Sequence, residues 1–119
     1  MRRIMIMLAA LLSALAFSAG PANAGPGDLE MYGLTGLNPS AGTQFVPEAS
    51  IPATCTAVDV NQIPSGEVWS ARNLTSQTPV AFFTSLSNCT NNVRLLTLQP
   101  GQVNSAFVNA ATYIKAVPR

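Results

Sequence analysis

Proline and glycine cut the second half of the chain into runs that are too short for ordinary helices. From Ala53 onward, turn signals such as Pro64-Ser65-Gly66 and Pro100-Gly101 separate stretches of about five to eight residues, many of them β-branched or aromatic. None of these stretches places its apolar residues at the spacing that an amphipathic helix requires. The pattern predicts an all-β fold, either a small antiparallel sandwich or a Greek-key barrel.

The expected strands follow one another closely along the chain. They cover residues 54–60, 67–74, 80–84, 93–98 and 112–117. The run 93–98 is the return strand of a hairpin that begins with 80–84, and the polar segment 85–92 connects the two. Residues 103–111 contain several alanines, but Asn and Ser interrupt them, so we expect at most one helical turn there.

Residues 1–24 have the three-part composition of a secretory signal peptide. Arg2 and Arg3 give a positively charged start, residues 4–17 form an apolar run, and Ala22-Asn23-Ala24 offers the small residues that a signal peptidase accepts. We expect cleavage after Ala24. A membrane anchor is the alternative, but about 14 apolar residues fall short of the roughly 20 that a membrane-spanning helix needs. No later apolar run is long enough to span a membrane.

Cleavage also changes the charge of the chain. Without Arg2 and Arg3, four basic residues face five acidic ones, so the formal net charge moves from +1 to −1. A sparsely charged, nearly neutral surface gives no electrostatic reason to expect nucleic acid or anionic lipid as a partner. We expect a secreted or cell-envelope location and an extracellular or envelope protein as the partner.

The two cysteines, Cys55 and Cys89, are expected to form an intramolecular disulfide in an oxidising, exported setting. Free thiols and an intermolecular bridge are the alternatives. The bond matters because a domain of about 95 residues buries only about 60–70% of its unfolded surface and has little margin of stability. On the chain-entropy model, closing a loop of about 35 residues contributes about 3.8 kcal/mol.

Residues 25–53 differ in composition and in hydrophobic pattern from the rest of the chain after residue 24. Glycine and proline recur, and the apolar residues fit neither a strand period nor a helix period. We expect an extended or partly disordered Gly/Pro-rich arm that precedes a β-domain at residues 54–119. Met31, Tyr32, Phe45 and Val46 favour some order in this arm, because a fully solvated tail rarely retains such residues.

One part of the chain resembles a known family. Phe82-Phe83 begins a hairpin, a small polar loop containing Cys89 follows, and residues 95–98 return toward the turn at 100–101. This arrangement resembles the short exported bacterial β-domains related to the βγ-crystallin Greek key, which include secreted peptidase inhibitors. The resemblance covers residues 68–102 and implies a β-sandwich that binds a protein partner.

The family motif matches this sequence residue by residue only in part. Phe82-Phe83 corresponds to the aromatic pair that starts the hairpin. Asn91 or Asn92 stands where the motif has a glycine, and asparagine tolerates the left-handed backbone region that such a turn needs. Ser105 corresponds to the closing serine. The paired acidic or amide positions that bind calcium in such domains are not recognisable, so no metal residue is carried over.

The chemistry that an enzyme would need is missing from the sequence. The chain contains no histidine, which removes the commonest general base, the Ser-His-Asp and Cys-His arrangements and most zinc sites. Lys115, the single lysine, lies in the last predicted strand and is expected to be solvated. We therefore expect no catalytic residue and no cofactor.

Two pairs of carboxylates invite interpretation as a catalytic or a metal-binding site. Asp59 and Glu67 lie at opposite ends of a predicted strand–turn connection, and a chain this small leaves little wall for a sugar cleft between them. Asp28 and Glu30 alternate along an extended segment, but calcium needs six to eight oxygen ligands. We expect all four to be ordinary solvated side chains, and no metal site.

Three further residues have a local interpretation. Asn73 and Asn88 each begin an Asn-x-Thr triplet, the acceptor pattern for N-glycosylation, and both are expected to be unmodified turn residues. Trp69 stands near the start of a predicted strand and is expected to anchor the core.

The segment 85–92 is the strongest candidate for a binding site. Ser85, Leu86, Ser87 and Asn88 open a polar loop that Cys89 would tie to the domain, and loops held by a rigid scaffold commonly carry binding. A plain hairpin connection is the alternative. The sequence thus predicts an exported, non-enzymatic binding module, with a peptidase inhibitor as its specific form. The alternative is a structural or envelope-associated protein held by residues 25–53.

Overall fold

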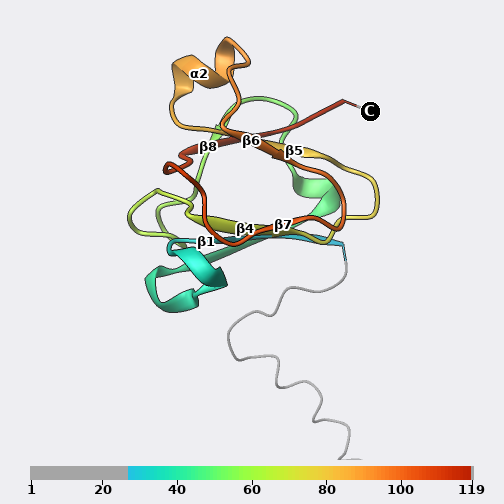
Figure 1. The fold of residues 1–119 in the computed structure, drawn as a ribbon. Helices are drawn as coiled ribbons and strands as arrows, with labels where there is room; N and C mark the ends of the chain where they lie inside the picture. Colours follow the sequence, from blue (N-terminus) through green and yellow to red (C-terminus); the bar gives the residue numbers. More distant parts are fainter. Residues whose placement is uncertain (1–26, 119) are drawn as a thin grey trace, which may run out of the picture.

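A computed structural model describes residues 27–118 of the chain. The predicted signal peptide and its cleavage site lie outside the described residues. Residues 27–118 form two four-stranded antiparallel sheets that pack face to face (Figure 1). The predicted all-β class is confirmed, and of the two architectures considered the structure is the sandwich.

The first sheet contains β2 (Thr43–Pro47), β1 (Asp28–Tyr32), β4 (Ser70–Asn73) and β7 (Val103–Asn104), in that spatial order. Strand β1 is central because it pairs with β2 on one side and with β4 on the other. Leu29 and Met31 are fully buried in the core between the sheets, so Glu30 and Tyr32 lie on the outer face.

The position of β1 corrects the predicted arm. Residues 25–53 were expected to precede the β-domain, but the described part of this range supplies two strands of the first sheet, and a boundary at residue 53 is wrong. Turns and three short 3-10 helices follow these strands: η2 (Thr35–Leu37), η3 (Pro39–Ala41) and η4 (Glu48–Ser50). The glycines and prolines of the range belong largely to these connections, and they mask the two short strands between them.

The second sheet contains β3 (Thr56–Ala57), β8 (Tyr113–Ala116), β5 (Val80–Phe83) and β6 (Leu96–Leu98). The predicted hairpin is confirmed, since Val80 pairs with Leu98 and Phe82 with Leu96. Strand β3 is shorter than expected because Asp59 already begins a turn, in which its carbonyl accepts from the amides of Gln62 and Ile63.

Most connections join the two sheets rather than neighbouring strands. Among residues 27–118, only the β1–β2 and β5–β6 connections stay within one sheet. The stretch 103–111 forms β7 and irregular structure, without the helical turn that the sequence allowed. In the described part of the chain no helix is long and apolar enough to cross a membrane.

The core is anchored by phenylalanines and not by Trp69. Phe82 is fully buried and packs edge-to-face on Phe107, with the ring centroids 5.2 Å apart. Trp69 is only partly buried, and its indole N–H donates to Glu67 at 3.2 Å. The predicted role of Trp69 is therefore wrong, because the indole needs a polar partner that lies at the surface.

Candidate functional site

The segment 85–92 is a capped helical turn and not the irregular loop that the sequence predicted. The Ser85 hydroxyl accepts from the Asn88 amide at 3.0 Å and so caps α2 (Leu86–Thr90). Asn92 then takes a left-handed backbone conformation, with φ of 57°, and reverses the chain. The Val93 amide donates to the Asn88 carbonyl at 2.7 Å. A five-residue helix is too short to produce a visible period, so its only sequence signal is the capping serine.

The predicted disulfide is confirmed and fixes this turn to the sandwich. Cys55, at the start of the second sheet, is bonded to Cys89 of α2, and their Cα atoms are 5.9 Å apart. Cys89 is fully buried against Ala81 and Phe83, with Tyr113 at the edge of this small cluster. The turn therefore covers the outer face of the second sheet, on the side away from the first sheet (Figure 1).

The four predicted site residues have two different roles. Ser85 and Asn88 hold the turn: Ser85 is the cap, and the Asn88 side chain donates to the Thr84 hydroxyl at 2.8 Å. Leu86 and Ser87 face solvent, and Leu86 is 49% exposed. Val93, which the sequence did not single out, is 56% exposed at the end of the same turn. The apolar surface of this site therefore consists of Leu86 and Val93.

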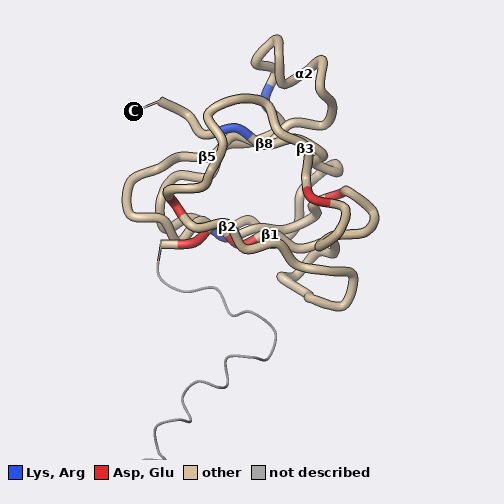
Figure 2. Tube along the Cα trace, turned by 180° about the vertical axis from the view of Figure 1, so that it is seen from behind, with Lys and Arg blue, Asp and Glu red and all other residues tan. Residues whose placement is uncertain are grey.

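Charge is scarce around the turn. Figure 2 shows the basic and acidic residues of the described chain, with one basic segment at the base of the turn. Arg94 follows the turn directly in the sequence, and its Nε donates to the Asn92 side chain at 3.0 Å and its Nη1 to the Thr97 hydroxyl at 3.3 Å. The surface of the turn is thus neutral, with one positioned guanidinium beside it.

The residues weighed as catalytic groups have structural partners. Asp59 accepts from the Gln62 side chain and the Asn61 amide, and these bonds hold the pKa of its carboxyl below the usual value. Glu67 accepts from the Trp69 indole. Lys115, expected to be solvated, places its ammonium group 5.8 Å from the centre of the Phe83 ring. Within residues 27–118, no three His, Cys, Asp or Glu side chains are placed to hold a metal ion.

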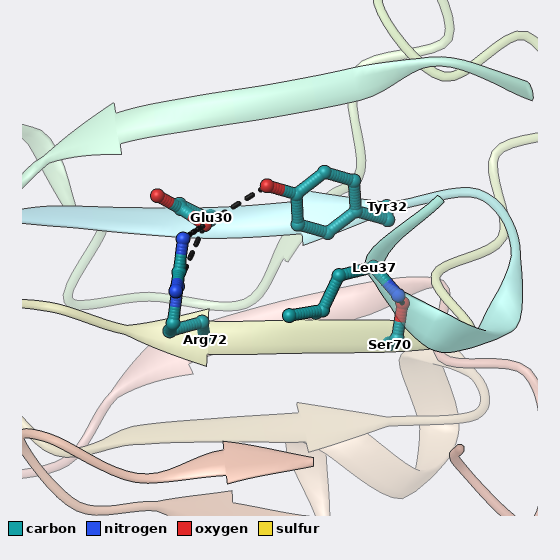
Figure 3. A network of polar contacts seen from close by, with 5 residues as sticks. All are labelled: Glu30, Tyr32, Leu37, Ser70 and Arg72. Atoms are coloured by element: carbon teal, nitrogen blue, oxygen red, sulfur yellow. Dashed lines mark hydrogen bonds and ion pairs between the residues drawn. The ribbon is translucent and has the colours of Figure 1, made fainter. Parts of the chain in front are cut away.

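Glu30 contradicts the prediction of a solvated acid. Its residue is only 2% exposed, on the outer face of the first sheet (Figure 3). Its Oε1 accepts from the Tyr32 hydroxyl at 2.9 Å and from Arg72 Nε at 3.0 Å, and Arg72 Nη2 completes the ion pair at 2.9 Å. Burial, followed by this bond to Glu30, raises the pKa of Tyr32. Glu30 can be buried because the sheet register places Arg72 directly opposite it.

Asn73 is also internal, although its triplet had suggested a turn residue. The side chain is fully buried, and its Nδ2 donates to the carbonyls of Thr78 and Leu98, both at 2.9 Å. Its Oδ1 accepts from the Thr75 amide at 3.0 Å and from the Thr75 hydroxyl at 2.6 Å. Every polar atom of this amide is therefore engaged inside the fold, and none is available as a glycan acceptor.

A groove of about 460 Å³ opens at the end of the sandwich near Asn73. Three separate parts of the chain line it: the first wall is Ser76, Gln77 and Pro79, the second is the turn at 99–100, and the third is residues 117–118. Sequence reasoning missed this site, and no local motif would have revealed it. Its walls meet only because β8 lies beside β5, so that the Val117 amide donates to the Pro79 carbonyl at 2.9 Å.

Comparisons of the chain with models of known protein families, with curated proteins and with solved structures find no match. The resemblance to βγ-crystallin-related domains therefore stays a prediction. Any functional assignment rests on the geometry of the tethered turn and of the groove.

Proposed function

We propose that this protein is an exported, non-enzymatic binding module that presents the turn at residues 85–94 to a protein partner. The observation that carries this proposal is the exposure of two large apolar side chains, Leu86 and Val93, at 49% and 56%, on one short segment. Apolar side chains left exposed together on a fixed element offer area that a partner can bury.

The rigidity of the turn supports this assignment. Binding is weakened by the entropy lost when a flexible segment becomes ordered, and a segment that is already ordered avoids that cost. The turn is held by the Cys55–Cys89 disulfide, by the Ser85 cap and by the bond from Asn88 to Thr84. These constraints leave Leu86 in a defined orientation before any partner arrives.

The chemistry of the turn defines the partner surface. A neutral apolar patch beside Arg94 fits an apolar pocket with an acidic group at its edge. Peptidase inhibition is the specific form that the family resemblance implies. Because Leu86–Thr90 is helical, an inhibitor built on it would block access to the peptidase rather than enter its cleft as an extended, substrate-like strand.

Export is part of the same proposal. A disulfide persists in oxidising compartments, and residues 1–24 have the composition of a cleavable signal peptide. The intact mass of the secreted protein tests this directly. We expect the mass of residues 25–119 less two hydrogens, and an uncleaved chain or one carrying two free thiols would contradict the proposal.

The alternative of a structural envelope protein loses one of its two motives, and the other, the low charge of the chain, does not favour it over a binding module. It relied on residues 25–53 as an arm that docks on a neighbour, and the described part of this range belongs to the first sheet. We therefore propose a single function.

A pair of matched double variants tests the binding surface. Leu86→Ser with Val93→Ser removes the apolar patch, while Val60→Ser with Val108→Ser removes two valines from other loops that are more exposed, at 60% and 90%. Immobilised secreted protein is used to capture partners from culture medium and envelope fractions, and the captured proteins are quantified. We expect the first variant to capture at least ten times less of the partner protein than the second. Equal capture by both variants, with the disulfide intact, would refute the proposed site.

A further inference from the structure

The groove at the end of the sandwich has walls that are fixed without any ligand. One fully buried amide sets the distance between two of them. Asn73 Nδ2 donates to the carbonyl of Thr78, which adjoins the first wall at Gln77 and Pro79. It also donates to the carbonyl of Leu98, which adjoins the second wall at residues 99–100. The Asn73 backbone also accepts from the Gly101 amide at 2.7 Å and donates to the Gln102 carbonyl at 2.9 Å.

A carboxylate fixes the first wall from outside. Glu48 accepts from the amide and hydroxyl of Ser76, from the Gln77 amide and from the Thr78 hydroxyl, at 2.7 to 3.1 Å. The third wall is joined to the first by the bond from the Val117 amide to the Pro79 carbonyl. Because the walls of the groove are already fixed, binding a ligand costs little entropy for ordering the protein.

The lining is uncharged and offers unused amide groups. None of the lining residues is acidic or basic. The side chains of Gln77 and Gln99 make no hydrogen bond with any other residue in the range 27–118, so each retains one acceptor oxygen and two donor hydrogens. Pro100, Val117 and Pro118 supply accessible apolar surface, while Pro79 is buried beneath them.

We propose that this groove binds an extended, uncharged peptide segment of another protein. A primary amide offers one donor and one acceptor, which match the carbonyl and the N–H of a peptide unit, and the proline rings accommodate small apolar side chains. Among residues 27–118 the lining includes no cation for an anionic ligand. It also includes no aromatic ring on which a sugar could stack, which favours a peptide over an oligosaccharide. This site is separate from the turn at residues 85–94 in its position and in its residues.

The test follows the side-chain amide signals of the secreted protein by nitrogen–proton NMR. The probe is an uncharged hexapeptide of alternating proline and valine with both termini blocked. The comparison probes are the same peptide with glutamate in place of valine, and a neutral trisaccharide. We expect saturable shifts of the Gln77 and Gln99 side-chain signals with the uncharged peptide alone. Shifts with the trisaccharide alone, or no shift with the peptide at millimolar concentration, would overturn the proposal.

Variants separate this site from the tethered turn. Gln99→Leu removes one amide and is expected to raise the Kd for the peptide about fivefold to tenfold, as expected for the loss of one or two hydrogen bonds. Gln62→Leu, an exposed glutamine elsewhere, is the matched control and should leave the Kd unchanged. The Leu86→Ser, Val93→Ser variant should also bind the peptide normally. An unchanged Kd in Gln99→Leu would refute the assigned lining, whatever the outcome for the turn.

Discussion

Reduction of the Cys55–Cys89 disulfide is the perturbation whose effect can be worked out most directly from the structure. The bond joins residues 34 apart in sequence. On the chain-entropy model, opening a loop of this length returns about 12.6 cal/mol/K to the unfolded chain, or about 3.8 kcal/mol at 25 °C. A domain of this size has a free energy of unfolding of about 5–14 kcal/mol, so the bond accounts for a large part of it.

Reduction is preferable to substitution for this measurement. Cys89 is fully buried against Ala81 and Phe83, so replacing it would add the energy of a packing defect to the entropic effect. Reduction leaves both sulfur atoms in place. For a domain of this length, each kcal/mol shifts the Tm by about 4–8 °C, and we expect the Tm to fall by about 15–30 °C.

The assay is urea unfolding of the oxidised protein and of the protein kept reduced by a thiol reagent, followed by circular dichroism. The difference in the free energy of unfolding between the two forms gives the contribution of the bond. A difference in the free energy of unfolding below about 1 kcal/mol would refute the reasoning. It would mean that residual structure around β3 and α2 restricts the unfolded chain as much as the disulfide does.

Three other predictions concern stability. Hydrogen bonds, first that from Thr78, lower the pKa of Glu48 from 4.5 to about 2. The stability that the Glu48 carboxylate contributes at neutral pH should therefore be lost as the pH falls from about 4.5 to about 2. In an acid titration of Glu48→Gln, this part of the fall in stability should be absent. Arg72→Met should cost roughly 1–3 kcal/mol in urea unfolding, less than a fully buried pair because the Arg72 side chain is 40% exposed, and adding Glu30→Leu should recover part of the loss. Phe82→Ala should cost about 3–5 kcal/mol and lower the urea midpoint without disrupting the disulfide.

The parts of the fold that the sequence predicted correctly are those encoded by local pattern. The hairpin of β5 and β6 was recognisable because an apolar run, a polar connection and a second apolar run follow one another without interruption. The pairing of Cys55 with Cys89 followed from there being two cysteines in a chain with a predicted export signal. These features need only neighbouring residues or a count.

The first sheet was harder to predict because turn-forming residues stand on both sides of its central strand. Strand β1 alternates correctly, with Leu29 and Met31 inward, but glycine and proline stand directly before it and glycine directly after it. Five residues of alternation in such surroundings look like an arm. Only the pairing partners β2 and β4 distinguish the centre of a sheet from an extended tail, and pairing at that distance leaves no local trace.

The polar residues were misinterpreted for a related reason. Glu30 and Arg72 are 42 positions apart, and Asn73 reaches Leu98 across 25 positions. A carboxylate or an amide read alone is assigned to the surface, because burial is costly unless a partner is present. In this chain the partners come from other strands, so neither residue could be recognised as internal without the register of the sheets.

Specific polar side chains and the disulfide hold the two candidate sites in place. The apolar core between the sheets fixes the strands, but the turn and the groove stand outside it, where few apolar contacts are available. Their backbones are held instead by the Ser85 cap and the disulfide at one site, and by Asn73 and Glu48 at the other. Because each such bond depends on a specific atom, both sites should tolerate conservative changes in the core far better than changes in these polar side chains.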